Sequence, residues 1–471
     1  MGKKKSIFGT ALGYGIGAIG LDLSYGMFYS YLSYYLSSVL GLEEGFLLLI
    51  TPLARIWDGI NDPMMGTVVD NTRTKFGKYR PWILIGALCN AVVLFLLFTS
   101  FGMSGLPLYI YIGIMYVAWG MTNTMADIPY WSMVPSFTSD PKERNIIATI
   151  ARTFSGLGQG IISILTPVML PLLSVTMING EKVADAKGYS TWAIICAVAL
   201  VGFSALSVSQ TKERVITTPK EKFSFKKIFK VIGANDQLRT FMLFAMLSNA
   251  GWYMVSGVSV YFFDVVVGDP AKQSTFSLIG AVGSVLGLGV VPVLTKFISR
   301  KRTYQVSLSL ALAGFIGMLI CAKAQAYMIM NFCYLLASIG VASMFVSQTV
   351  FLADIVDYGE IKMGNRAEAI TFSMKGFLQK MAYTIQTIIL FAGLIISNYT
   401  PKSAEKLTYT QAEQSAVSFM MLICPIILIT LSLIVFSTKY KLHGEFMENI
   451  TKQINEKHAE FKEEGKCKWI N

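Results

Sequence analysis

Charged residues are scarce in this sequence. Asp, Glu, Lys and Arg make up 14% of the 471 residues, and hydrophobic residues make up 54%. A soluble globular domain carries about 25% charged residues, so a string of soluble domains is excluded. Histidine is rarer still, since only His443 and His458 occur, both close to the C-terminal end. Histidine-centred catalysis is therefore not expected, and we expect a protein that is not an enzyme and needs no cofactor.

Cysteine is also sparse, and its spacing carries no signature. The six cysteines include no CxxC pair and have no histidine cluster beside them. This pattern excludes a disulfide framework and a zinc site. The cysteines are Cys89, Cys196, Cys321, Cys333, Cys424 and Cys467.

Apolar residues come in runs of roughly twenty, the length that crosses about 30 Å of hydrocarbon as an α-helix. These runs predict an all-α integral membrane protein with 12 transmembrane helices. The expected spans are 10–38, 45–69, 81–103, 107–135, 147–174, 188–209, 240–265, 274–298, 304–324, 327–356, 367–397 and 413–437.

The net charge of +12 would suggest nucleic acid in a soluble protein, but here the basic residues lie between apolar runs and at the ends. Anionic lipid headgroups explain that placement, so no nucleic-acid partner is expected. If the termini and every second loop are assigned to one side, that side collects about 30 Lys and Arg residues against six in the other loops. The positive-inside rule then predicts that both termini are cytoplasmic.

The longest internal polar stretch divides the spans six and six. We expect a six-helix bundle at 1–209, a cytoplasmic middle loop at 210–239, a second bundle at 240–437 and a cytoplasmic tail at 438–471. This is the organisation expected of a major-facilitator transporter, whose halves rock about a site near the bilayer midplane. We expect a monomer.

Several charged residues fall inside the predicted spans, where they require an explanation. Asp58 and Asp62 are four residues apart and share a helix face, with Asn61 beside them. Two such carboxylates repel in a low dielectric, and a bound cation or proton removes the conflict. Oxygen ligands without His or Cys suit a hard cation such as Na⁺, so we predict a site for Na⁺, Li⁺ or H⁺ at Asp58 and Asp62. Structural ion pairs with Arg55 and Arg152 are the alternative.

The fourth span places Thr124, Asp127 and Trp131 on one face. Thr124 can add a hydroxyl to the cation cluster, Asp127 can bind sugar hydroxyls, and Trp131 can stack on a pyranose ring. An interfacial anchor is the alternative role for this tryptophan. Arg152, in the fifth span, is placed to pair with Asp22 or Asp127, and a guanidinium with a carboxylate forms a clamp for hydroxyl groups.

The second half contributes charges with a predicted mechanical role. Lys380 lies in the middle of the eleventh span, and we predict that it exchanges partners with the aspartates as the cation leaves. The stretch ADIVDYGEIKMGNRAE follows the tenth span. We predict that its acids pair on the cytoplasmic face when the outside is open, unless they form only a solvated charge run. The acids are Asp354, Asp357 and Glu360, and the candidate partners are Arg144, Arg300 and Arg366.

Gly15, Gly17 and Gly20 spell GxGxxG, but no strand precedes them and the stretch is apolar. A dinucleotide site is therefore rejected, and close helix packing by small residues is expected instead.

Four motifs carry a family resemblance. ARIWDGINDPMMG, TRTKFGKYRPW, WGMTNTMADIPYWSMVP and IVDYGEIKMGNR closely resemble the glycoside–pentoside–hexuronide:cation symporters, the group that contains the melibiose carrier. The resemblance runs over nearly the whole chain and implies a multi-pass protein of a bacterial inner membrane. It implies a cation site at Asp58, Asn61, Asp62 and Thr124, with Lys380 next to it. It implies a sugar site that includes Asp22, Tyr29, Asp127, Trp131 and Arg152.

The chain departs from the melibiose carrier at three positions. Leu21 replaces a lysine, Phe345 matches a pocket tryptophan, and Lys375 matches a pocket glutamine. An additional positive charge at Lys375 suggests an anionic sugar such as a hexuronide, as a hypothesis. The sequence does not identify the sugar.

These observations predict a cation-coupled sugar or glycoside symporter that works by alternating access. Two other classes were weighed. A membrane prenyltransferase is evoked by Asp58-x-x-x-Asp62 and Asp354-x-x-Asp357, but such enzymes have no division into six and six spans. A transporter of lipids or drugs would keep the fold, but the aromatic and charged partners for hydroxyl groups favour a polar substrate.

Overall fold

The computed structural model describes residues 7–138, 140–178, 181–213, 225–364, 367–401 and 408–463. Helices dominate it, because an apolar segment in lipid must satisfy its backbone hydrogen bonds internally. The elements of the first half are α1 (Ile7–Gly26), π-turn η1 (Met27–Tyr31), α2 (Leu32–Tyr34), π-turn η2 (Tyr35–Val39), α3 (Glu44–Asn71), α4 (Arg80–Leu97), α5 (Gly105–Ser132), 3₁₀-turn η3 (Val134–Ser136), α6 (Pro141–Leu173), β1 (Met177–Ile178), β2 (Glu181–Lys182) and α7 (Ala186–Gln210).

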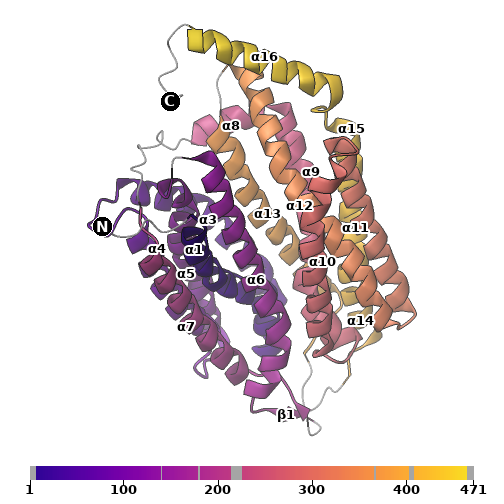
Figure 1. Ribbon diagram of the computed structural model, residues 1–471. Coiled ribbons are helices and arrows are strands. Elements are labelled where there is room, and N and C mark those ends of the chain that lie inside the picture. The colour runs from indigo at the N-terminus through magenta and orange to yellow at the C-terminus, as the bar shows by residue number, and fades with distance from the viewer. Residues whose placement is uncertain are drawn as a thin grey trace. The chain divides into compact units, whose positions relative to one another are not determined.

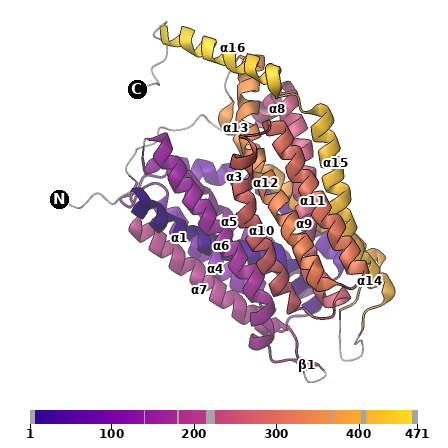
Figure 2. The same ribbon diagram turned by 45° about the vertical axis from the view of Figure 1, so that its right-hand side comes forward.

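The rest of the chain is also helical within the described residues, and Figures 1 and 2 show its course. Its elements are α8 (Phe225–Ala234), α9 (Asp236–Tyr261), π-turn η4 (Phe262–Val266), α10 (Lys272–Leu294), α11 (Arg300–Lys323), α12 (Tyr327–Met363), α13 (Glu368–Ile396), α14 (Gln411–Ser418), π-turn η5 (Phe419–Ile423), α15 (Cys424–Lys439) and α16 (Gly444–Glu463).

Each predicted span coincides with a helix. Among the described residues, 11 helices are long and apolar enough to cross a membrane. Of the helices at the predicted spans, α3, the predicted second span, is not apolar enough to be counted among these 11. It has 28 residues and is therefore long enough, but it contains Arg55, Asp58 and Asp62. The structure thus establishes a multi-span helical protein, while the count of 12 spans stays a prediction.

Two boundaries differ from the prediction in a way that matters for the site. The tenth span was expected to end at 356, but α12 continues to Met363 and stops where Gly364 adopts a left-handed φ of 77°. Asp357 and Glu360 therefore lie on the helix and not in a loop after it. The predicted middle loop, 210–239, contains the short helix α8 and the start of α9.

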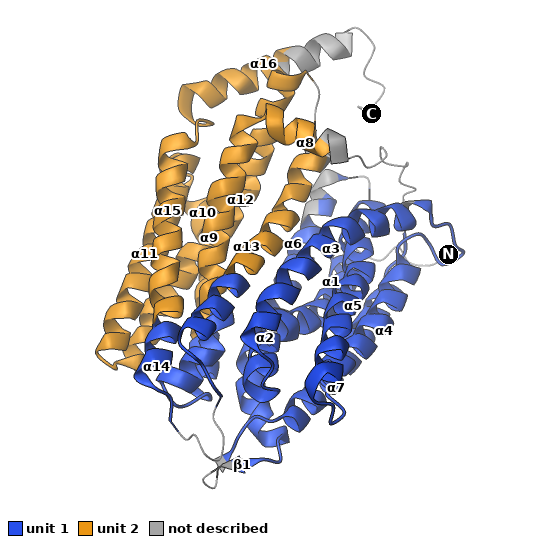
Figure 3. Cartoon of the chain, turned by 180° about the vertical axis from the view of Figure 1, so that it is seen from behind, with its two compact units in different colours: residues 1–223, 256–278, 387–418 blue, residues 224–255, 279–386, 419–471 orange. Residues whose placement is uncertain are grey.

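The chain forms two compact units, shown in Figure 3. Unit 1 comprises residues 1–223, 256–278 and 387–418, and unit 2 comprises 224–255, 279–386 and 419–471. Unit 1 therefore includes the C-terminal end of α9 with η4, the start of α10, the end of α13 and α14, in addition to α1–α7. The helices α9, α10 and α13 each have residues in both units.

In unit 1, α1 packs closely against α6 and α7 because glycines line its surface. A Cβ added to Gly15 would come within 3.2 Å of Phe154 on α6, and one added to Gly20 would come within 3.0 Å of the Leu200 carbonyl oxygen on α7. A Cβ added to Gly17 would come within 2.8 Å of the Ser207 Cβ on α7. The expected role of the GxGxxG stretch in helix packing is confirmed.

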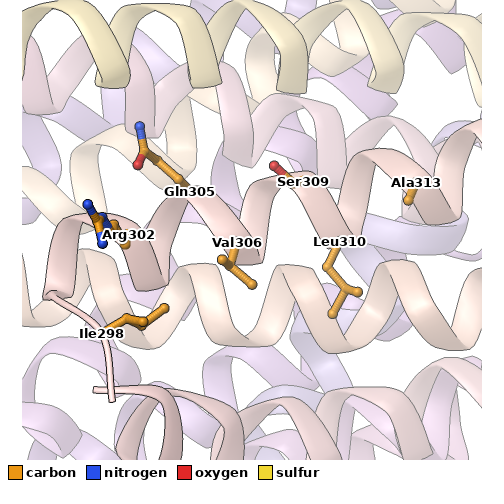
Figure 4. A pocket seen from close by; sticks show the side chains of 7 residues that line it. All are labelled: Ile298, Arg302, Gln305, Val306, Ser309, Leu310 and Ala313. Atoms are coloured by element: carbon orange, nitrogen blue, oxygen red, sulfur yellow. The ribbon is translucent and has the colours of Figure 1, made fainter. Parts of the chain in front are cut away.

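In unit 2, α11 lies beside α12 and α15, and α16 lies across the end of α12 (Figures 1 and 2). An aromatic cluster of Phe244, Tyr304, Phe351 and Phe436 forms part of the core, with Phe351 stacked on Phe436 and the other rings meeting at tilted or edge-to-face angles. A shallow hollow of about 510 Å³ runs along α11 (Figure 4). None of the predicted site residues lines it; the lining residues are Ile298, Arg302, Gln305, Val306, Ser309, Leu310 and Ala313.

Candidate functional site

Two pairs of residues face each other across the contact between α3 and α5. Asp58 and Asp62 are one turn apart on α3, and Gly120 and Thr124 are one turn apart on α5. The Thr124 hydroxyl donates to Asp62 Oδ1 at 2.9 Å. A Cβ on Gly120 would come within 2.7 Å of Asp58 Oδ1, so only glycine lets this carboxylate approach α5 so closely. The i, i+4 pairs of the two helices are therefore in register.

Asn61 lies beside this seam. Its side chain is half-buried, and its amide nitrogen is buried without a hydrogen-bond partner among the described residues. A half-turn of the amide about the Cβ–Cγ bond would present Oδ1 at that position instead. Carboxylate, hydroxyl and amide oxygens are the ligands that hard cations prefer, and Asp58, Asp62, Thr124 and Asn61 supply them.

A buried ion pair lies at one end of the predicted cation site formed by Asp58, Asn61, Asp62 and Thr124. Arg55 Nη1 donates to Asp58 Oδ2 at 2.7 Å, and both side chains are nearly inaccessible. The same Nη1 donates to the Tyr29 hydroxyl on η1 at 2.8 Å, and the guanidinium lies 5.6 Å from the ring centroids of Phe28 and Tyr29. The charge of Asp58 is therefore already compensated, and a cation at Asp58 has to compete with Arg55.

Residues predicted for the sugar site form a second group in unit 1. The indole N–H of Trp131 donates to Asp127 Oδ1 at 2.9 Å, and the Arg152 guanidinium lies 3.6 Å from the centroid of the Trp131 ring. Asp22 on α1 lies near Ser155, Asp127 and Arg152. Helices α1, α5 and α6 thus bring two carboxylates, an indole and a guanidinium together, which is the clamp expected for hydroxyl groups.

The position of Arg152 changes the predicted role of Trp131. One face of the indole is covered by the guanidinium, so a sugar ring can stack only on the other face or after Arg152 has moved. The guanidinium is itself exposed and carries its donors to the edge of this group. Arg152 and Trp131 therefore form a cation–π pair.

Tyr29, which is predicted for the sugar site, also contacts Arg55 beside the predicted cation site. Its ring stacks on Tyr25 at 4.2 Å, and its hydroxyl accepts the hydrogen bond from Arg55. A chain of contacts therefore runs from Asp58 through Arg55 to Tyr29 on the first span. Asp22, which is also predicted for the sugar site, lies on the same span.

Sequence reasoning missed several residues of this site. Trp119 is buried and stacks on Phe28 with centroids 3.6 Å apart, and its N–H donates to Ser24. Ser24 donates to Asn90 Oδ1 at 2.6 Å, which fixes α1 against α4. The spacing of Arg55 and Asp58, i and i+3, was a readable signal for their pairing. The contacts of Trp119 and Asn90 are tertiary, and no local spacing indicates them.

The predicted residues of the second half lie in unit 2. Lys375 Nζ donates to Thr349 Oγ1 at 2.5 Å, and Lys380, also on α13, is half-buried. Asp354 Oδ1 accepts from Arg300 Nη1 at 2.9 Å, which is one of the pairs named among the alternatives for the cytoplasmic gate. Their roles stay predictions.

Three more residues predicted for the cytoplasmic gate have separate outcomes. Arg144 is in unit 1, where its Nε donates to the Thr138 carbonyl oxygen at 2.8 Å. Arg366 lies outside the described residues. Asp357 is half-buried on α12. The pairing of these residues across the two halves stays a prediction.

Comparison with known proteins gives a consistent picture. The model of the family described as MFS/sugar transport protein matches residues 13–444. The raffinose carrier protein of Pediococcus pentosaceus is 28% identical over 485 residues, covering 98% of this chain and 72% of that protein. A putative glycoside/cation symporter of Escherichia coli is 27% identical, covering 94% of each chain.

Solved structures agree at the level of the fold. The crystal structure of a D-xylose–proton symporter superposes with a TM-score of 0.63 over 92% of this chain and 98% of that one. Its sequence identity is 11%, so this likeness supports the arrangement of the helices alone.

The register of α3 and α5 makes a prediction at Gly120. Gly120→Ala places a methyl group against the Asp58 carboxylate, and we expect sodium affinity to fall about tenfold because the carboxylate must move. Sodium affinity is measured from the rise in Tm of the purified chain when NaCl replaces choline chloride at equal ionic strength.

Gly113→Ala on the same helix is the control, because the nearest atom to a Cβ there is 3.8 Å away. It should leave sodium affinity unchanged. An unchanged sodium response in Gly120→Ala would contradict the assignment of this seam as the cation site.

Proposed function

This chain belongs to the MFS/sugar transport protein family, and from that premise we propose that it carries a sugar or glycoside across the membrane together with a monovalent cation. The transport is secondary active symport by alternating access. The contact chain Asp58–Arg55–Tyr29 is the observation that carries the proposal, since it connects the oxygen-rich seam of α3 and α5 with the first span. The names of the relatives, a raffinose carrier and a putative glycoside/cation symporter, support the choice of substrates.

The cation binds between Asp58 and Asp62, with Thr124 and Asn61 as further oxygen ligands. Na⁺ suits this set because all four side chains offer hard oxygen donors. Li⁺ and H⁺ are the other coupling ions that two carboxylates accept. Entry of the cation takes over the charge compensation that Arg55 gives to Asp58.

Coupling follows from that competition. When the cation displaces Arg55 from Asp58, the hydrogen bond from Arg55 to Tyr29 also changes, and the first span is free to adjust around Asp22. Sugar then binds to Asp22, Asp127, Trp131 and Arg152 with higher affinity. By linkage, sugar must tighten cation binding by the same factor, typically about 5- to 150-fold.

The remaining expectations complete the scheme. The chain crosses a bacterial inner membrane as a monomer with 12 helices, α3 included, arranged six and six with both termini in the cytoplasm. Lys380 exchanges partners with the aspartates when the cation leaves. Arg144, Asp354, Asp357 and Arg366 close the cytoplasmic side. The basic loops support this orientation.

The identity of the sugar is open, and Lys375 offers one hypothesis. Its ammonium group, now bonded to Thr349, would favour an anionic sugar such as a hexuronide. If Lys375→Gln transports a hexuronide as fast as the wild type, the hypothesis is lost.

The cation assignment predicts that Asp62→Asn abolishes sodium-stimulated uptake. The substitution removes one of the two carboxylates and leaves the Arg55–Asp58 pair in place, so the fold is retained. Asp58→Cys should also abolish coupling, although it leaves Arg55 buried without its anion and costs about 3–5 kcal/mol of stability. Uptake of labelled sugar into proteoliposomes, with and without a sodium gradient, is the measurement.

Asp269→Asn, at an exposed aspartate that pairs with Lys272 at 3.5 Å, is the control and should transport normally. Full sodium-coupled uptake in Asp62→Asn would refute the cation site. The sugar for these assays is chosen from a panel of glycosides, pentoses and hexuronides by its sodium-dependent protection against thermal unfolding.

The assignment of the sugar site predicts variants that lose sugar binding but keep the response to sodium. Asp22→Asn and Arg152→Ala should abolish sugar binding, because each removes a charged partner of the hydroxyl groups, while sodium still raises the Tm. Equilibrium binding of the labelled sugar and the sodium response are measured on the same sample. Normal sugar affinity in either variant would remove that residue from the pocket.

A further inference from the structure

A buried carboxylate in η4 takes no part in either group described above. Asp264 is 6% exposed, and its Oδ2 accepts two tyrosine hydroxyls. Tyr34, on α2, donates at 2.8 Å, and Tyr409, just before α14, donates at 2.5 Å. Tyr34 and Tyr409 are 230 and 145 residues away from Asp264 in the chain. All three residues belong to unit 1.

Further hydrogen bonds join the same three segments. The Tyr261 and Ser37 hydroxyls are 2.7 Å apart, and those of Tyr399 and Ser38 are 2.8 Å apart. Ring contacts fill the space between them: Tyr34 meets Tyr261 at 5.1 Å. We call the set of Tyr34, Ser37, Ser38, Tyr261, Asp264, Tyr399 and Tyr409 the tyrosine cluster.

The residues next to Tyr399 and Tyr409 are hydrogen-bonded to a buried acid. Glu413 is 1% exposed and accepts the backbone N–H groups of Thr400 at 2.8 Å and Thr410 at 2.7 Å. The two tyrosine rings stack with centroids 5.8 Å apart. Thr410, the residue next to Tyr409, is therefore held by a buried carboxylate.

The helices in the tyrosine cluster carry π-turns. Tyr34 lies between η1 and η2, and Asp264 lies inside η4. A π-turn inserts one extra residue into the helical repeat and is most frequent at functional sites. Its conversion to α-helix rotates the following side chains by about 100°, one residue of a helix with 3.6 residues per turn. Such a change would turn Tyr34 or Asp264 away from its partners without unfolding the helix.

Resting on the proposed function, we propose that Asp264, Tyr34 and Tyr409 form a latch that closes the extracellular side of the transporter. The first span, the end of α9 and the segment before α14 all reach that side in the proposed orientation. Alternating access requires these segments to separate when the outside opens, and hydrogen bonds of 2.5–2.8 Å exist only while they are together. Asp264 is a positioning residue: it sets the balance between the closed and open outer side and binds no substrate.

The latch predicts a defined effect for the loss of one hydroxyl. Tyr34→Phe and Tyr409→Phe keep the ring but remove a donor to a buried carboxylate, which should shift the equilibrium toward the open outer side by about tenfold. Asp264→Asn keeps an acceptor oxygen and should shift it less than Asp264→Leu. Hydrogen–deuterium exchange of the full-length chain in nanodiscs, followed by mass spectrometry, reports the opening without a substrate.

Exchange in the wild type and in each variant is compared for two sets of peptides. Peptides that cover 30–40, 256–267 and 396–401 should exchange about tenfold faster in Tyr34→Phe and Tyr409→Phe. Peptides that cover 72–80 and 350–363 should exchange more slowly, because the inner side closes as the outer side opens. General destabilisation would raise exchange in both sets, so acceleration in both sets would overturn the latch.

The matched control is Tyr35→Phe on the neighbouring residue. The Tyr35 hydroxyl is buried without a hydrogen-bond partner among the described residues, so its removal should leave exchange at the wild-type rate. Wild-type exchange in both Tyr34→Phe and Tyr409→Phe, or equal acceleration in Tyr35→Phe, would overturn the proposal.

Transport assays separate the latch from the proposed function. In the latch variants, net sugar uptake should fall several-fold while sugar and sodium affinities stay within about twofold, since neither binding group is altered. If the wild-type chain moves no sugar but the reciprocal exchange pattern appears, the latch stands and the proposed function fails. If sugar is moved and the pattern is absent, the latch alone fails.

Discussion

The buried pair between Arg55 and Asp58 is the interaction on which the account depends. A charge placed in a lipid-shielded helix is unfavourable by several kcal/mol unless it has a partner (about 2.5–3.5 kcal/mol on insertion scales). On α3 the partner is supplied three residues away, so the helix can remain in the membrane without a bound ion. An ion that reaches Asp58 must therefore displace the Arg55 guanidinium. In the proposed mechanism, this displacement signals to the first span that the ion is bound.

In the proposed mechanism, the binding of the ion can affect the first span because one nitrogen of Arg55 bonds both to Asp58 and to Tyr29. Its Nη1 contacts both Asp58 and the Tyr29 hydroxyl, which lies in the π-turn η1 of the first span. The first span also carries Asp22 toward the sugar group and Tyr34 toward Asp264. One discontinuous helix thus touches the cation seam, the sugar group and the tyrosine cluster. Its two π-turns, η1 and η2, lie between Asp22 and the end of the span.

Much of this arrangement could be predicted from local sequence, because helical spacing places residues on a common face. The spacing of Asp58 and Asp62, together with Thr124, predicted one oxygen-rich group, and Thr124 does donate to Asp62. Apolar runs located the helices, including α3, whose charges remove it from the set of clearly apolar spans, while some helix ends differ from the prediction by six or seven residues, as at Met363.

The contacts that sequence could not supply are tertiary. Arg152 was expected to pair with an aspartate, and its guanidinium also lies 3.6 Å from the centroid of the Trp131 ring, which no local spacing indicates because the two residues are on different helices. Asp264 falls at the end of the predicted span 240–265, and its role was not predicted because its tyrosine partners are far away in the chain. Gly120 matters only through what faces it across the helix contact.

A sodium titration of Arg55→Gln by calorimetry tests the central claim most directly, and it needs no knowledge of the sugar. If Arg55 competes with the cation for Asp58, removing its charge should tighten sodium binding by about tenfold relative to the wild type. Unchanged or weaker sodium binding in Arg55→Gln would contradict the account, because Arg55 would then be a passive part of the helix packing.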